Sequence, residues 1–388
     1  MERNVPKLRF KGFNDEWQLS NLKKLCDINP KSKELPDKFV YIDLESIIDG
    51  VLIKKNIIEL KDAPSRAQRL LNVGDVLFQT VRPYQMNNYL FEYELNYKSV
   101  ASTGYAQLRC KNCISNNKFI YQALHNKKFN NKVMLRCTGT SYPAINSSEL
   151  VTIPLRIPSL QEQERIANFL TKVDKIIEKQ EEKVKNLENY KKGMMQKIFS
   201  QEIRFKDENG NEYPEWEEKR LGKIIVNKNK GGNALYCDYE ANILLSNEYL
   251  EKKVSNITYV SNTIDVYENH ILILWDGSQS GKVYTGVRGV LGSTFVSIEL
   301  DKFNNNIFVY QYLNYKKNLI QEVWREGSGV PHVAKDFINN FKIFLPCLEE
   351  QVKISEVLNK IDLLQEKETN KLENLRQLKK GLLQQMFV

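Results

Sequence analysis

The sequence is poor in the residues from which enzymes most often build metal centres and nucleophilic sites. Its three histidines, His125, His270 and His332, do not lie at the spacing of a metal pair or a catalytic triad. Six cysteines are scattered over 388 residues, which is typical of reduced intracellular thiols rather than of a disulfide framework. No stretch approaches the roughly 18 consecutive apolar residues of a membrane span, and residues 1–13 lack the apolar run of a signal peptide. We therefore expect a soluble, cytoplasmic protein.

Motifs for nucleotides and methyl donors are also missing. The segment Gly277-Ser-Gln-Ser-Gly-Lys282 has one residue too few between its glycines for a phosphate-binding loop, and Val283 replaces the required Ser or Thr. This segment predicts a hairpin loop instead. No Gly-x-Gly-x-x-Gly follows a strand, and Asn29-Pro30 continues into lysine rather than into the Pro-aromatic pair of an adenine methyltransferase. We expect no catalytic residues in this chain.

Three cysteines form the one candidate metal site. Cys110 and Cys113, together with Cys137, could hold zinc, but the second half of the chain has no counterpart. We expect no metal and no cofactor bound by this chain.

The charge balance favours a polyanionic partner. There are 57 basic and 48 acidic residues, a formal net charge of +9. Such an excess suits nucleic acid, although an ordinary basic protein fits it equally well. At 388 residues the chain also exceeds one ordinary core, so two or more domains are expected.

The chain repeats itself once. Pro346 follows Pro158 by 188 residues, and Phe387 follows Phe199 by the same number. Between these limits the register holds without a gap, as in Leu160-x-Glu-Gln163 and Leu348-x-Glu-Gln351. Upstream the likeness is looser, with Arg9-Phe-Lys11 recurring as Arg204-Phe-Lys206, and residues 26–100 share little with residues 225–290. The pattern indicates a tandem duplication with a constant frame and variable interiors.

A heptad stripe follows each of the two equivalent prolines. Apolar residues alternate in steps of three and four, which predicts two long helices starting near Ser159 and after Pro346. If the duplicated halves are related by a pseudo-two-fold axis, these helices run antiparallel and pack against each other; the alternative is that each folds back onto its own domain. The residues expected in the packing are Ile166, Leu170, Val173, Ile177, Val184, Leu187, Ile354, Leu358, Ile361, Leu372, Leu375 and Leu382. Charged flank residues such as Lys183, Lys185, Glu188, Glu366, Lys371 and Arg376 could contact a partner, although a solvated face is the default.

The segments between the helices have a strand-rich texture. Val73–Phe78 and His270–Trp275 are short buried-strand runs, and one amphipathic helix is expected over each of Asn117–Lys128 and Asn306–Arg325. The fold class is therefore α+β multidomain, with two globular α/β domains in tandem duplication, separated by two long helices packed as an antiparallel coiled coil, pseudo-two-fold symmetric. The expected boundaries are 1–157 for the first domain, 158–203 for the first helix, 204–345 for the second domain and 346–388 for the second helix.

Together these residues resemble a known family. A Gly-(Thr/Ser)-x-x-Pro turn, a strand, Pro-x-Leu-x-Glu-Gln-x-x-Ile and a coiled coil ending in Lys-Lys-Gly are similar to the specificity subunit of type I restriction-modification systems, and the resemblance covers essentially the whole chain. It implies a non-catalytic protein whose two target-recognition domains each read half of a bipartite DNA site. It also implies that the helices set the gap and dock two modification subunits, with motor/endonuclease subunits joining through them. S-adenosylmethionine, ATP and magnesium are then expected on those partners. The alternative is a silent scaffold that binds partners without reading DNA.

Candidate DNA contacts lie in the loops after the buried strands and in the repeated turns. Base reading needs directional donors and acceptors, and phosphate contacts need Lys, Arg or small hydroxyls. In the first domain the candidates are Gln79, Arg82, Tyr84, Gln85, Asn87, Arg136, Thr140, Ser141 and Tyr142. In the second they are Ser278, Gln279, Lys282, Arg288, Arg325, Ser328, His332 and Lys335.

Overall fold

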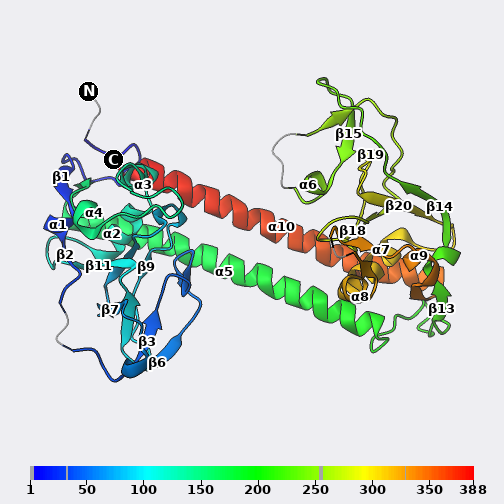
Figure 1. Ribbon diagram of the computed structural model, residues 1–388, viewed down its shortest axis with the longest axis horizontal. Coiled ribbons are helices and arrows are strands. Elements are labelled where there is room, and N and C mark those ends of the chain that lie inside the picture. The colour runs from blue at the N-terminus through cyan, green and yellow to red at the C-terminus, as the bar shows by residue number, and fades with distance from the viewer. Residues whose placement is uncertain (1–3, 32–33, 253–256, 328) are drawn as a thin grey trace. The chain divides into compact units, whose positions relative to one another are not determined.

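Two compact units make up the chain. The computed structural model describes residues 4–31, 34–252, 257–327 and 329–388. Unit 1 comprises Met1–Glu182 and Asn370–Val388, and unit 2 comprises Lys183–Thr369. Each unit contains one globular α/β part and one stretch of each long helix, α5 (Leu160–Phe199) and α10 (Leu348–Met386) (Figure 1). The mixed fold in tandem duplication is the one that the sequence predicts.

The globular part of unit 1 holds two four-stranded sheets and two small two-stranded ones. The order in the first sheet is β2 (Cys26–Ile28), β11 (Tyr105–Cys110), β8 (Val76–Gln79), β9 (Tyr89–Leu90). The order in the second is β6 (Asn56–Glu59), β3 (Lys38–Ile42), β10 (Ser99–Ser102), β7 (Ala67–Leu70). The remaining strands are the pair β1 (Gln18–Asn21) and β12 (Pro154–Ile157) and the hairpin β4 (Ile47–Ile48) and β5 (Val51–Leu52). The helices are α1 (Leu22–Leu25), α2 (Asn117–Leu124), α3 (Lys127–Met134), α4 (Ser147–Leu150), η1 (Leu60–Asp62) and η2 (Pro83–Gln85).

Unit 2 repeats this plan, but its second sheet has three strands where that of unit 1 has four. Its main sheet has the order β14 (Ile225–Lys230), β20 (Phe295–Leu300), β17 (Ile271–Leu274), β18 (Val283–Thr285). A second sheet has the order β16 (Tyr259–Val260), β15 (Asn242–Leu245), β19 (Val290–Leu291). Two strand pairs complete it, β13 (Glu217–Arg220) with β23 (Lys342–Leu345) and β21 (Arg325–Glu326) with β22 (His332–Val333). The helices are η3 (Leu221–Lys223), α6 (Asn247–Leu250), α7 (Asn306–Tyr315), α8 (Lys317–Val323) and α9 (Phe337–Asn340).

The prediction of one helix over Asn117–Lys128 and one over Asn306–Arg325 was wrong, because each region forms two helices. In unit 1 the break falls at Asn126, whose Oδ1 accepts from the backbone N–H of Lys128 at 2.8 Å and so starts α3. Its Nδ2 donates to the Leu383 carbonyl of α10 at 2.7 Å. An asparagine whose side-chain oxygen and nitrogen both form hydrogen bonds to backbone groups favours the start of a helix over its interior.

Within each unit the stretches of α5 and α10 run antiparallel. In unit 1 Asp174 pairs with Lys379 at 2.6 Å and Glu181 with Arg376 at 2.7 Å. Residue numbers therefore fall along α10 in the direction in which they rise along α5. In unit 2 Lys183 pairs with Glu368 at 2.7 Å and Lys191 with Asp362. The expected packing residues are buried at Ile166, Leu170, Val173, Ile177, Val184, Ile354, Leu358 and Leu372, and half-buried at Leu187, Ile361, Leu375 and Leu382. Of the residues that the structure describes, no helix is long and apolar enough to cross a membrane.

The repeated polar residues of the sequence form the same two contacts in both units. Glu162 is 1% exposed and accepts from Arg9 Nε and Nη2 at 2.8 Å, while Glu350 is 0% exposed and accepts from Arg204 at 3.0 Å. Gln122 Nε2 donates to Asp174 at 2.6 Å, as Gln311 Nε2 does to Asp362. The constant frame therefore consists of ion pairs and glutamine side-chain hydrogen bonds that join each globular part to the long helices.

Acid should destabilise unit 1 through His125. Burial and the nearby Lys379 ammonium lower the pKa of His125 from 6.5 to about 4. Below pH 6.5 the unfolded chain binds a proton that the folded unit does not, so stability falls as the pH drops from about 6.5 to about 4, by up to about 3 kcal/mol. We expect His125→Gln to flatten the pH dependence of the unit 1 melting temperature over this window. His332→Gln, in unit 2, should leave the wild-type slope in unit 1, and an unchanged slope for His125→Gln would contradict this account.

Candidate nucleic-acid interface

In unit 1 the loop after β8 and the Gly139–Pro143 turn lie side by side. The backbone N–H of Arg82 donates to the Pro143 carbonyl at 2.7 Å, and that of Ile145 donates to the Thr80 carbonyl at 3.0 Å. Arg82 has a φ of 54°, a left-handed conformation that residues other than glycine rarely adopt and that is common at binding loops. Two segments about sixty residues apart therefore form one surface.

Buried polar side chains shape this loop from inside. Gln79 is 1% exposed; its Nε2 donates to Gln85 Oε1 at 2.8 Å, and its Oε1 accepts from the Asn87 backbone at 3.1 Å. Asn87 Oδ1 in turn accepts from the Asp49 backbone at 3.0 Å. Gln79, expected to contact DNA, is therefore enclosed in this conformation and positions the loop instead.

The exposed candidates of unit 1 gather at the junction. The Arg82 guanidinium lies 4.4 Å from the centroid of the Tyr142 ring, and Tyr84 and Tyr142 are 50% and 63% exposed. Thr140 and Ser141 are exposed in the same turn. An arginine held over an aromatic ring keeps its outward N–H groups free to donate. Arg136 does not join this group, because its Nη1 donates to Thr152 Oγ1 at 3.0 Å.

Unit 2 contains an equivalent junction between the loop after β17 and the turn that ends at Pro331. The Gly277 N–H donates to the Pro331 carbonyl at 2.8 Å, and the Val333 N–H donates to the Trp275 carbonyl at 2.8 Å. β17 and β18 pair antiparallel around this loop, which confirms the predicted hairpin. Arg325 Nη1 donates to the Ser278 carbonyl at 3.3 Å, and Gln279 and His332 lie in the paired segments. Ser328, also a candidate, lies outside the described residues.

The three remaining candidates of unit 2 are Lys282, Arg288 and Lys335, and two of them contact other side chains of the unit. Lys282 pairs with Glu251, which also accepts from the Tyr284 hydroxyl at 3.2 Å. Burial and the Glu251 carboxylate raise the pKa of Tyr284, so its hydroxyl stays protonated. Arg288 stacks on Tyr267 at the other end of the β17–β18 hairpin. Lys335 is exposed just after β22.

A cavity of about 770 Å³ beside the unit 2 junction was missed from the sequence. Its walls include Asn233, Tyr236, Asn247, Asp276, Ser278 and Gln279. Next to its wall two backbone segments approach each other closely, because a Cβ at Gly231 would lie 2.0 Å from the carbonyl oxygen of Gly292. Gly231 and Gly292 are visible in the sequence as glycines, but only the folded chain shows that their backbones lie next to each other.

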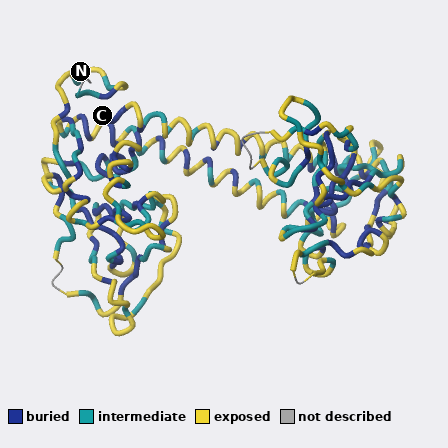
Figure 2. Tube along the Cα trace, turned by 45° about the horizontal axis from the view of Figure 1, so that its top comes forward, coloured by how far each residue is buried: buried dark blue, intermediate teal, exposed yellow. Residues whose placement is uncertain are grey.

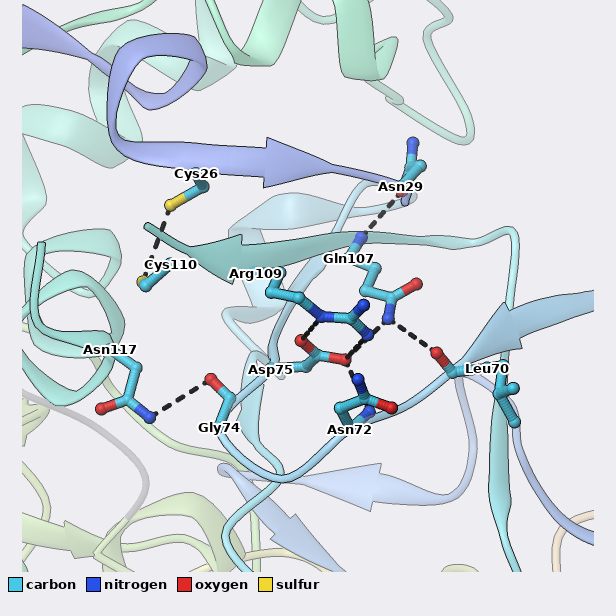
Figure 3. A network of polar contacts seen from close by, with 10 residues as sticks. All are labelled: Cys26, Asn29, Leu70, Asn72, Gly74, Asp75, Gln107, Arg109, Cys110 and Asn117. Atoms are coloured by element: carbon cyan, nitrogen blue, oxygen red, sulfur yellow. Dashed lines mark hydrogen bonds and ion pairs between the residues drawn. The ribbon is translucent and has the colours of Figure 1, made fainter. Parts of the chain in front are cut away.

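A network of polar contacts surrounds Asp75 at the start of β8, the strand whose other end carries the loop of the unit 1 junction (Figure 3). Asp75 is 1% exposed and precedes β8; it accepts from Arg109 Nε and Nη2 at 2.8 Å, from Gln107 Nε2 at 2.7 Å and from the Asn72 backbone at 2.7 Å. Gln107 also donates to the Leu70 carbonyl at 2.8 Å. The network therefore fixes β8, whose end carries the loop, against β11.

The cysteines do not gather as the zinc candidate would require. Cys110 Sγ lies 3.7 Å from Cys26 Sγ on the neighbouring strand, and Cys137 donates to the Val133 carbonyl at 3.4 Å. Within the described ranges no group of three or more His, Cys, Asp or Glu side chains could hold a metal ion.

Comparison with known proteins shows the family. The specificity subunit of the type I restriction enzyme MjaVIII from Methanocaldococcus jannaschii is 34% identical over 196 residues, 49% of this chain and 46% of that protein. The chain thus spans about half the length of this relative. The putative MjaX specificity subunit of the same organism is 25% identical over 405 residues, 98% of this chain and 95% of that protein. The alignment with this second relative therefore covers nearly the whole length of both proteins.

A solved structure shows the same fold. The type I restriction-modification S subunit from M. genitalium matches over 99% of both chains, with a TM-score of 0.65 and 17% identity. The sequence model described as "Type I restriction modification DNA specificity domain" matches residues 14–189 and 213–376, one copy in each half of the duplication. The chain therefore belongs to the family of type I restriction-modification DNA specificity subunits.

Proposed function

We propose that this chain reads a bipartite DNA target, each unit recognising one half through its loop and turn junction. The observation that carries the proposal is the repeated geometry. The Arg82 to Pro143 and Gly277 to Pro331 backbone bonds hold equivalent loops against equivalent turns, while the side chains presented there differ. A constant support with variable side chains is what reading two different half-sites requires.

The long helices complete the proposed division of labour. They would set the gap between the half-sites and dock two modification subunits, with motor/endonuclease subunits joining through these. S-adenosylmethionine, ATP and magnesium would then act on the partner chains, and this chain would contribute no catalytic residue. The alternative, a scaffold that does not read DNA, gives no reason for the different polar and charged side chains that the two matching junctions carry.

We expect Arg82→Ala to weaken specific DNA binding by roughly tenfold to a hundredfold, because a well-placed arginine contributes about 1–3 kcal/mol to base discrimination. Arg136→Ala is the matched control, since Arg136 is exposed but bonded to Thr152 outside the junction, and it should change affinity less than about threefold. The measurement is fluorescence anisotropy of the complex with the modification subunit, on a selected target and a scrambled duplex at fixed salt. Equal effects of the two variants would show that the junction is not part of the DNA interface.

A further inference from the structure

Two cysteine side chains of unit 1 face each other across neighbouring strands. Cys26 is the first residue of β2 and Cys110 the last of β11, and the antiparallel register of the two strands places them opposite each other. Their Sγ atoms lie 3.7 Å apart, and Figure 3 shows the two sulfur atoms joined by a contact. The two residues are 84 positions apart in the sequence, so only the fold brings them together.

The hydrogen bonds between β2 and β11 give this pair the geometry of a cross-strand disulfide. The Lys111 N–H donates to the Leu25 carbonyl at 3.0 Å. Hydrogen-bonded and non-hydrogen-bonded pairs alternate along an antiparallel ladder, so the next pair, Cys26 and Cys110, is non-hydrogen-bonded. The Cα atoms of such a pair are about 4.5 Å apart, within the range of roughly 4.4–6.8 Å that disulfides span. Bond formation therefore requires rotation of the two side chains and no shift of the strands.

The equivalent position in unit 2 carries no sulfur. There the Asp301 N–H donates to the Ile224 carbonyl at 3.0 Å, and the next pair along the two strands is Ile225 opposite Leu300. One copy of the sheet is thus built with an aliphatic pair at this place. The two thiols of unit 1 therefore add a reactive pair that the packing of the sheet does not require.

Cys110 is the more accessible of the two thiols and the one that ionises more easily. Cys26 is 2% exposed, whereas Cys110 is half-buried against the core of unit 1. Figure 2 shows the buried segments of this globular part with half-buried and exposed segments around them. The hydrogen bond with Cys26 lowers the pKa of the Cys110 thiol against the opposing effect of burial, and the same hydrogen bond together with burial raises the pKa of the Cys26 thiol. Because the thiolate is the nucleophile, an oxidant reacts first at Cys110.

We propose that Cys26 and Cys110 form a reversible disulfide when the chain meets a peroxide, and that this bond stabilises unit 1 by linking β2 to β11. The Cys110 thiolate attacks one oxygen of hydrogen peroxide and the O–O bond breaks, which leaves a sulfenic acid on Cys110. The second oxygen leaves as hydroxide and takes up the proton that the Cys110 thiol released, forming water. The Cys26 sulfur then attacks Cys110 Sγ, the S–O bond breaks, and the oxygen leaves as a second water with the Cys26 proton. In total the two thiols lose two electrons and two protons, and the peroxide is reduced to two water molecules.

The disulfide would act on the sheet that supports the reading loop. β11 pairs with β8 along Tyr105–Leu108, and Arg109, the neighbour of Cys110, binds Asp75 at the start of β8. A link between residues 84 positions apart removes conformational entropy from the unfolded chain. We therefore expect the melting temperature of unit 1 to rise by roughly 10 °C on oxidation.

The test is peptide mapping and calorimetry of the full chain before and after treatment with hydrogen peroxide. Free thiols are blocked with iodoacetamide, and mass spectrometry of a non-reduced digest should find the Cys26 and Cys110 peptides joined, with two hydrogen atoms missing. In differential scanning calorimetry the transition of unit 1 should rise by roughly 10 °C and return to its starting value after dithiothreitol. The transition of unit 2 should stay in place.

Cys113→Ser is the matched control, because Cys113 is an exposed cysteine three residues after Cys110. It should keep both the joined peptides and the rise, whereas Cys26→Ala and Cys110→Ala should lose both. Each oxidised variant is compared with its own reduced form, so a lower starting stability does not obscure the result, and the peptides of the wild-type chain decide the pairing without any substitution. A wild-type chain in which Cys110 is oxidised to sulfinic acid or joins Cys113 would contradict the proposal. A linked chain that melts no higher than the reduced one would contradict it equally.

Discussion

Replacing residues 15–157 by the corresponding segment of a relative with a different target is expected to change one half of the recognised DNA motif and leave the other half intact. Methylation at the original motif should fall by about a thousandfold, the usual margin between specific and non-specific sites. The physical reason is that the first junction, from Thr80 to Ile145, lies entirely inside this segment. The readout is the set of methylated adenines in a host that contains no other methylation.

The reciprocal exchange, of residues 210–345, is the control. It should change only the other half of the motif, because the Gly277 to Pro331 junction lies in that segment. A change in both halves after either exchange would show that the two units do not read independently. Unchanged motifs after both exchanges would place recognition outside the junctions.

Asp75→Ala is expected to destabilise unit 1 by about 2–4 kcal/mol, because it removes a buried carboxylate and leaves its arginine and amide donors without their acceptor. Asp75 accepts four N–H groups at 2.7–2.8 Å, from Arg109, Gln107 and Asn72. In differential scanning calorimetry the transition of unit 1 should move to lower temperature while that of unit 2 stays in place. Methylation should fall with it, since β8 carries the reading loop.

Asp27→Ala is the matched control for this change. Asp27 lies in the same sheet, but its side chain is 62% exposed and its pair with Lys111 is long, at 3.8 Å. Exposed pairs contribute at most about 1 kcal/mol, so the melting temperature should barely change. Equal shifts for Asp27→Ala and Asp75→Ala would contradict the role given to the network.

The duplicated frame was predictable from sequence because its residues act in register. Gln122, Asp174 and Lys379 repeat as Gln311, Asp362 and Lys191, and each trio meets as a polar contact between a globular part and the helices. Spacing alone was enough to match them, because Asp174 and Lys191 recur at a shift of 188 residues and Gln122 recurs at a shift of 189. Their pairing across the two copies, Asp174 of one with Lys379 of the other, required the fold.

The candidate site was predictable only in outline. Loops after buried strands are recognisable, so Arg82, Tyr84 and Tyr142 were found at the junction, where Arg82 is half-buried and the two tyrosines are exposed. Burial within a loop depends on tertiary contacts, which is why the enclosure of Gln79 and the engagement of Lys282 by Glu251 could not be foreseen. The break at Asn126 was missed for a similar reason, because the Leu383 carbonyl that its side chain bonds lies 257 positions later in the chain.

The most direct test of the central claim is a methylome. The chain would be co-expressed with its modification subunit in a methylation-free host, and modified adenines would be mapped by single-molecule sequencing. The account predicts a split motif, in which two short specific halves flank an unspecific gap of constant length. A continuous motif, or no methylation despite a stable complex of the two proteins, would contradict it.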